Sequence, residues 1–182
     1  MRHLLVLLAL VVVTGCKNEP RHHHIAGLEV TAPGHWDAEL ERDEDSAQLT
    51  FDSWLDDGLC MVQVLEADVP PPVYFETMSQ QFGGARASGT KHETRMLQSP
   101  LGNLVGIAYR GRVPDTGGVV GSVAKLAGPV RLEHYALSQG DRLVTGTLMT
   151  FEDDQRAAEK MRKKCHAVLQ SLRPAGVALE VP

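Results

Sequence analysis

The residues with the most reactive side chains in this sequence are three cysteines, Cys16, Cys60 and Cys165. A thiolate is a nucleophile that can be acylated or alkylated, and two thiols can be oxidised to a disulfide. Disulfides form and persist in oxidising compartments outside the cytoplasm. The sequence around each cysteine therefore decides which reaction is expected.

Cys16 closes an apolar segment at the start of the chain. Residues 4–13 are an unbroken apolar run that follows the basic Arg2. As a helix this run would be about 15 Å long, half of a bilayer core, so it is typical of a cleaved signal peptide. The next residues complete the phrase VTGC at 13–16, which resembles the bacterial lipobox. We predict that residues 1–15 are removed and that Cys16 is lipidated, which anchors the protein to a membrane of the bacterial cell envelope.

Cys60 and Cys165 are expected to form a disulfide. Cys60 lies on the apolar face of a predicted strand at residues 59–66, and Cys165 lies on the apolar face of a predicted helix at residues 152–172. A helix that packs on a sheet brings two such faces together, and an exported domain permits the oxidation. Two free buried thiols are the alternative, because cysteine is often buried without a bond.

The histidines are the candidate metal ligands and acid–base groups. His22, His23 and His24 are adjacent, so they cannot all face one ion from a single strand or helix. His134 falls on a predicted strand and His166 on the predicted terminal helix. No serine, histidine and acid form a recognisable catalytic set. We therefore predict no catalytic residue, no metal ligand and no cofactor.

The elements that must position these residues are mostly strands. Alternation of apolar and polar residues predicts strands at residues 27–33, 37–42, 48–54, 59–66, 91–97, 104–112, 130–137 and 143–151. In the strand at 104–112, Gly106 and Ala108 share one face and leave room there for a close neighbour.

Two helices are expected between and after these strands. The first follows three prolines and carries an apolar stripe of Tyr74, Phe75, Met78 and Phe82, which we interpret as core. The second is the long terminal helix at residues 152–172. Its predicted buried residues recur at helical spacing: Ala157, Met161, Cys165, Val168 and Leu172.

Three segments show no periodicity. Residues 16–26 are predicted as the lipidated cysteine and a flexible tether, and residues 174–182 as a loose tail. Residues 115–128 form a glycine-rich stretch with no assigned role. It lacks the lysine and hydroxyl that complete a phosphate-binding loop. Residues 27–173 then remain as a single folded domain.

Composition limits the partners. The chain has 182 residues and a formal net charge of −5, which becomes −6 when the signal peptide with Arg2 is removed. Nucleic acids and anionic membrane surfaces select basic faces, so no nucleic-acid partner is expected. The predicted contact with a membrane is made by the lipid on Cys16, and an envelope protein is the expected partner.

The chain resembles the PsbP-like family and its DcrB-like bacterial lipoprotein relatives. The resemblance rests on the order of the elements, on Gly27, Val30, Pro33 and Trp36 near the start, and on the phrase VLQSL at residues 168–172. It implies an α+β fold in which helices pack on an antiparallel sheet, as an α/β/α sandwich. The family is known for binding and assembly roles and shares no active site, so no catalytic residues carry over. The glycine-rich stretch departs from the family pattern.

Two functions are consistent with the sequence. The first is a non-enzymatic envelope lipoprotein whose domain binds a partner or supports an assembly. The second is an envelope hydrolase or metal-binding protein that uses His134, His166 or the histidines at residues 22–24. Stoichiometric zinc or copper in the purified protein would favour the second function over the first.

Overall fold

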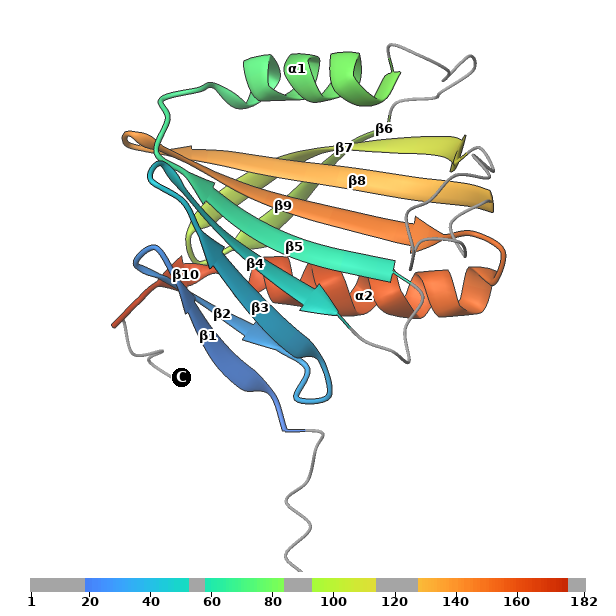
Figure 1. The fold of residues 1–182 in the computed structure, drawn as a ribbon, viewed down its shortest axis with the longest axis horizontal. Coiled ribbons are helices and arrows are strands. Elements are labelled where there is room, and N and C mark those ends of the chain that lie inside the picture. The colour runs from blue at the N-terminus through green and yellow to red at the C-terminus, as the bar shows by residue number, and fades with distance from the viewer. Residues whose placement is uncertain (1–18, 53–57, 84–92, 114–127, 177–182) are drawn as a thin grey trace, which may run out of the picture.

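A computed structural model of the protein describes residues 19–52, 58–83, 93–113 and 128–176. Within these ranges the chain forms a seven-stranded antiparallel sheet, a three-stranded sheet and two helices. Figure 1 shows helix α1 (Pro71–Gly83) on one side of the larger sheet, and helix α2 (Gln155–Gln170) with the smaller sheet on the other. The α+β fold with helices packed on an antiparallel sheet, expected from the sequence, is confirmed.

The large sheet contains the strands that alternation predicts. Its order is β3-β4-β5-β9-β8-β7-β6, so β9 and β8 lie in its middle and β3 and β6 at its edges. The strands are β3 (Asp37–Arg42), β4 (Ser46–Asp52), β5 (Gly58–Leu65), β6 (Glu93–Ser99), β7 (Gly102–Val113), β8 (Gly128–Gln139) and β9 (Arg142–Phe151).

The small sheet corrects two predictions. Its strands are β1 (Arg21–Ile25), β2 (Leu28–Ala32) and β10 (Arg173–Pro174), with β2 in the middle. The flexible tether expected over residues 16–26 is therefore wrong for residues 21–25, because β1 pairs along its whole length with β2 and buries Ile25. The loose tail expected from residue 174 is also wrong at its start, since Pro174 pairs with β2.

Helix α2 packs on the large sheet through the predicted apolar stripe, shifted by one residue at its start. It buries Ala158, Met161, Cys165, Val168 and Leu169. The helix begins after Asp154, whose side chain accepts hydrogen bonds from the backbone N–H groups of Arg156 and Ala157, and so satisfies two donors that a helix start leaves unpaired.

Two glycines of the large sheet allow α2 to approach closely. A Cβ at Gly146 would lie 2.4 Å from the Leu169 side chain, and one at Gly58 would lie 2.8 Å from Met161. Gly106 makes similar room for the ring of Tyr135, whose nearest carbon would be 2.4 Å from an added Cβ. The close neighbour that the sequence predicts at Gly106 is thus an aromatic ring from the adjacent strand.

Helix α1 is less buried than its apolar stripe predicts. It packs against β8, and of the stripe Phe75 is buried while Tyr74 and Met78 are half-buried; the side chain of Phe82 lies outside the described part of the chain. Val73 on the same helix is 52% exposed. Phe75 and Leu143 belong to a small apolar cluster that is separate from the main core under α2. No helix in the described part of the chain is long and apolar enough to cross a membrane.

The strand β1 gives a first prediction. Ile25→Ala should destabilise the protein by about 2–5 kcal/mol, because a fully buried isoleucine leaves a cavity when truncated. His24→Ala, on the exposed side of the same strand, should change stability by less than about 0.5 kcal/mol. Urea unfolding of the two variants compares them directly. Equal, small effects would mean that residues 21–25 are a tether after all.

Candidate functional site

A buried polar network joins strand β8 to helix α2. Arg131, Glu133 and Tyr135 alternate along β8, so their side chains lie on the face of the sheet that α2 covers. Arg131 Nε donates to Glu133 Oε1 at 2.6 Å, and the Tyr135 hydroxyl donates to Glu133 Oε2 at 2.7 Å. All three residues are at most 1% exposed. Burial of this carboxylate is tolerated because its oxygens are fully occupied by donors.

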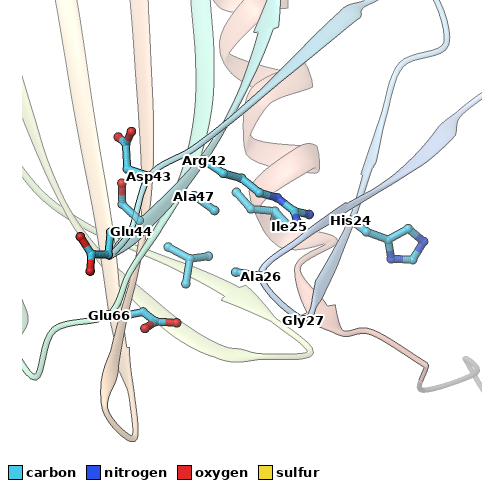
Figure 2. Close-up of a pocket in the computed structure, with 11 residues that line it drawn as sticks. His24, Ile25, Ala26, Gly27, Arg42, Asp43, Glu44, Ala47 and Glu66 are labelled. Carbon is cyan, nitrogen blue, oxygen red and sulfur yellow. The ribbon is translucent and has the colours of Figure 1, made fainter.

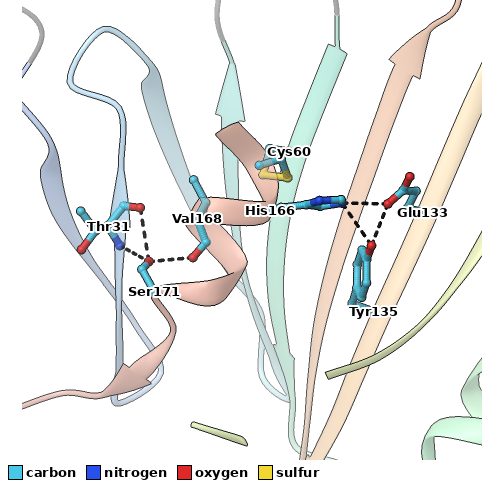
Figure 3. Close-up of a disulfide and its surroundings, with 8 residues drawn as sticks. Thr31, Cys60, Glu133, Tyr135, His166, Val168 and Ser171 are labelled. Carbon is cyan, nitrogen blue, oxygen red and sulfur yellow. Dashed lines mark hydrogen bonds and ion pairs between the residues drawn. A yellow bond between two sulfur atoms is a disulfide. The ribbon is translucent and has the colours of Figure 1, made fainter. Parts of the chain in front are cut away.

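His166 brings α2 into the same network. Its Nε2 lies 2.8 Å from Glu133 Oε2 and 3.1 Å from the Tyr135 hydroxyl, as Figure 3 shows. The His166 ring also contacts the Tyr135 ring edge to face, with centroids 5.7 Å apart. At the other end of the network, Arg131 Nη2 donates to Glu93 of β6 at 3.0 Å. The network therefore ties α2, β8 and the edge strand β6 together.

The electrostatics of Glu133 favour a structural role. Burial raises the pKa of this carboxyl, but hydrogen bonds from His166, Tyr135 and Arg131 outweigh burial and lower the pKa to about 2. Burial and the bond to Glu133 raise the pKa of Tyr135. Glu133 is thus a carboxylate and Tyr135 a neutral phenol near neutral pH, so neither is poised to exchange a proton. The network holds α2 on the sheet.

The disulfide lies beside this network. Cys60 of β5 is joined to Cys165 of α2 with their Cα atoms 5.6 Å apart, and both residues are fully buried. The predicted pairing of these two cysteines is confirmed. Because Cys165 and His166 are neighbours in α2, one turn of the helix is fixed to β5 by a covalent bond and to β8 by the polar network (Figure 3).

The other predicted histidine, His134, lies on the opposite face of the sheet. Its Nδ1 is 3.0 Å from the Thr147 hydroxyl, and its ring contacts Tyr109 edge to face. Burial lowers the pKa of His134 to about 4, so the ring is neutral at neutral pH. His134 and His166 are therefore separated by the sheet and do not form one site.

The histidines at residues 22–24 are part of β1. His22 Nδ1 lies 2.9 Å from a Glu29 oxygen on β2, whereas His23 faces the other way and contacts the Phe51 ring. The alternation of the strand separates the three rings, as their adjacency predicts. In the residues that the structure describes, no group of three His, Cys, Asp or Glu side chains is placed to hold a metal ion.

A small pocket lies between the β1–β2 turn and the β3–β4 turn. It has a volume of about 310 Å³, and its lining includes Asp43, Glu44, Glu66 and His24. Figure 2 shows the His24 ring turned away from the carboxylates. Glu66 also lies 3.7 Å from Arg142. The carboxylates and the histidine therefore do not converge on a point where an ion could bind.

A larger groove runs between α1 and the strands β6 and β7. We call it the α1 groove. It has a volume of about 560 Å³ and its lining is mostly apolar: Pro71, Pro72, Phe75, Val105, Ile107 and Tyr109, with Glu76 and Thr94 at its polar positions. Val105 is 41% exposed. Volumes of 300–1,000 Å³ with a largely apolar lining and few polar groups are typical of binding sites.

The remaining predicted sites lie outside the described residues. Cys16, with the signal peptide at residues 1–15, is one of them, and the glycine-rich stretch at residues 115–128 is described only at Gly128, where β8 begins. Lipidation of Cys16 stays a prediction from the sequence.

Two features of the site were not foreseen from the sequence. Arg131, Glu133 and Tyr135 recur at every second position of a strand that was predicted correctly, and polar residues with that spacing in a central strand are a signal for a buried network. The sequence carries no such signal for the α1 groove. An apolar stripe on α1 looks the same whether its side chains are buried in the core or line an open groove.

Comparison with known proteins supports the fold. No protein-family model and no curated protein matches the sequence. The solution structure of cyanobacterial PsbP (CyanoP) from Synechocystis sp. PCC 6803 is similar, with a TM-score of 0.54 and 13% identity over 86% of this chain and 93% of CyanoP. The fold is therefore PsbP-like, as the sequence predicts.

Two crystal structures are similar at lower scores. One is a protein from Bacteroides thetaiotaomicron, with a TM-score of 0.49 and 9% identity. The match covers 91% of this chain and 52% of that protein, so this chain spans about half of its length. The other is LpqN, involved in cell envelope biogenesis of Mycobacterium tuberculosis, with a TM-score of 0.44 and 12% identity over 86% of this chain and 90% of LpqN.

The network around Glu133 predicts a stability that falls in acid. A group whose pKa is lowered by folding contributes stability above its ordinary pKa of 4.5, and this contribution is lost as the pH falls toward about 2. The difference in unfolding free energy between wild type and Glu133→Gln should shrink by on the order of 3 kcal/mol between pH 5 and pH 2. Urea unfolding at several pH values measures it.

Glu39→Gln on the exposed strand β3 is the control and should follow the wild-type pH dependence. A difference between wild type and Glu133→Gln that does not change with pH would contradict the network as described.

Proposed function

We propose that this protein is a membrane-anchored lipoprotein of the bacterial envelope whose domain binds an apolar segment of an envelope protein and catalyses no reaction. The lipobox phrase at residues 13–16 and the short apolar run before it support the anchor. The disulfide between Cys60 and Cys165 supports export, because such bonds persist outside the cytoplasm.

The observation that carries the binding role is the α1 groove. Among the described residues of its lining, Glu76 is the single charged side chain, so the groove favours an apolar occupant over an ionic one. The exposed apolar surface continues beyond it at Met96, which is 63% exposed and pairs directly with the lining residue Val105. Apolar patches of this kind on a protein surface are typical of sites where another protein docks.

The groups that could do acid–base chemistry support binding over catalysis. Glu133 and Tyr135 are each satisfied within the polar network and lie under α2, away from the α1 groove. His134 is 1% exposed and hydrogen-bonded to Thr147. Two described histidines do contact a carboxylate and a hydroxyl. The Nε2 atom of His166 meets both Glu133 and Tyr135, and the Nδ1 atom of His22 meets both Glu29 and Thr31. A catalytic histidine instead meets its carboxylate and its nucleophile on opposite ring nitrogens, so these contacts favour a structural role.

The anchor would hold the domain close to the membrane. Strand β1 begins at Arg21, only five residues after Cys16. Five extended residues span at most about 18 Å. The partner is therefore expected within reach of the same membrane surface, which favours a protein that is itself held in the envelope.

The anchor is tested by replacing the lipidated thiol. Cys16→Ser should leave the protein as an uncut precursor or release it from membranes. Release is expected if the precursor is cut, because the apolar run at residues 4–13 leaves with the signal peptide and no other acylation site is predicted. Membrane fractionation with immunoblotting measures both outcomes. A processed Cys16→Ser protein that still sediments with membranes would contradict the lipid anchor.

The groove is tested by photo-crosslinking in intact cells. A benzophenone amino acid at Glu76, in the groove lining, should give a covalent adduct, whereas the same amino acid at the exposed Glu39 of β3 should not. Adding Pro72→Asp should reduce the Glu76 adduct several-fold, because an apolar occupant of the groove would have to strip water from the new carboxylate.

Pro72→Asp should leave the fold intact, because Pro72 is exposed and an acid in the first turn of α1 suits the helix dipole. Thr77→Asp, exposed on the same helix but outside the groove lining, should leave the adduct unchanged. Equal adducts at Glu76 and Glu39, or an adduct insensitive to Pro72→Asp, would contradict binding in the groove.

A further inference from the structure

The two edge strands of the large sheet differ in how they are protected from pairing with another strand. Among the described residues, no strand pairs with the outer edge of β3 or of β6. Edge strands expose unpaired backbone N–H and C=O groups, and proteins commonly protect them with charges. Strand β3 is protected in this way, because Asp37, Glu39 and Glu41 are exposed within its six residues.

Strand β6 has no comparable protection. It has no proline, and its two charged residues are of opposite sign and paired. Arg95 Nη2 lies 2.9 Å from Glu93 Oε2, and Glu93 also accepts a hydrogen bond from the buried Arg131. Its middle residue is Met96, which is 63% exposed, an unusual position for a large apolar side chain on an open edge. The edge is therefore both neutral and apolar at its centre.

The exposed apolar surface extends from Met96 to the next strand. Met96 pairs directly with Val105 of β7, which is 41% exposed. Directly paired residues share one face of the sheet, and here that face is the α1 groove side, since Val105 lines the groove. Met96 and Val105 thus form an apolar row that runs to the very edge of the sheet.

We propose that a second copy of this chain covers this edge, with β6 pairing antiparallel to the partner's β6 about a two-fold axis at Met96. Met96 is the fourth of the seven residues in Glu93–Ser99, so this register pairs the strand along its whole length. An isologous contact of this kind is self-complementary by symmetry.

The side chains in this register are compatible. Glu93 would face the partner's Ser99, Thr94 the partner's Gln98, and Arg95 the partner's Leu97, so no like charges are directly opposed. Met96 would face the partner's Met96. The apolar row would then run continuously across four strands, from Val105 through both methionines to the partner's Val105.

The consequence is one continuous sheet through two copies. The two-fold axis stands perpendicular to the sheet, so both α1 grooves open on the same face, side by side. This inference rests on the composition and exposure of β6, and it holds whether or not the groove binds an envelope protein.

The dimer is tested with the full chain purified from membranes in a density-matched detergent. Sedimentation should show a wild-type dimer at tens of micromolar. Met96→Lys should raise the dimer Kd by on the order of 100-fold, because two like charges would be carried by directly opposed residues whose Cβ atoms are about 5 Å apart. Leu40→Lys is the matched control: Leu40 is 41% exposed on the other edge strand, and its change should leave the dimer intact.

Met96 is largely exposed, so Met96→Lys should keep the monomer's melting temperature, which separates loss of the contact from loss of the fold. A monomeric wild type, or a dimer that survives Met96→Lys, would overturn the proposal.

The register is tested by oxidation of introduced thiols. A mixture of Thr94→Cys and Gln98→Cys proteins should crosslink on oxidation, because these residues are directly opposed in the proposed pairing. Each protein alone should crosslink much less, since its two thiols would be four residues apart along the strands. Wild type gives the background from the native cysteines. Equal crosslinking in the mixture and in the single proteins would overturn the register.

Discussion

The close packing of α2 on the large sheet is the constraint on which the rest of the structure depends. It is possible because Gly58 and Gly146 have no side chain where Met161 and Leu169 must lie. At that distance Cys165 reaches Cys60. The same approach brings His166 to Glu133, so that a carboxylate can be buried in the centre of the sheet without an unmet hydrogen bond.

The position of α2 also explains the small sheet. The backbone N–H of Thr31 in β2 donates to the Ser171 hydroxyl just after the helix, and Ser171 in turn donates to the Val168 carbonyl (Figure 3). Arg173 of β10 bonds to Glu29 of β2. The N-terminal strands are thus fastened to the end of the same helix. One face of the large sheet is fixed by covalent, ionic and apolar contacts, and the opposite face retains the α1 groove and exposed apolar side chains.

Much of this fold could be predicted from residue patterns. Alternation identified each strand of the large sheet to within a few residues, because buried strands with one covered face carry a clear period of two. The disulfide followed from two cysteines on apolar faces of elements that must pack. The PsbP-like fold class followed from the order of the elements. In each case the pattern that allowed the prediction lies within one element, or in two elements whose apolar faces must pack together.

The errors have a different physical origin. Strand β1 was expected to be a tether because Arg21 and the histidines after it are polar; it is a strand because β2 satisfies its backbone and Ile25 fills the core. The Glu133 network required knowledge of which helix covers β8, and the α1 groove required knowledge of how far α1 stands from β6 and β7. Tertiary distances of this kind leave no trace in a local pattern.

The central claim is that the face bearing α1 binds a partner while the face under α2 serves the fold. Hydrogen–deuterium exchange of the full-length protein, compared between native membranes and purified detergent solution, tests it most directly. The account predicts that native membranes slow exchange in α1 and at the groove residues of β7, and leave α2 and β5 unchanged. Slower exchange in α2 or in the small sheet with no change in α1 would contradict it.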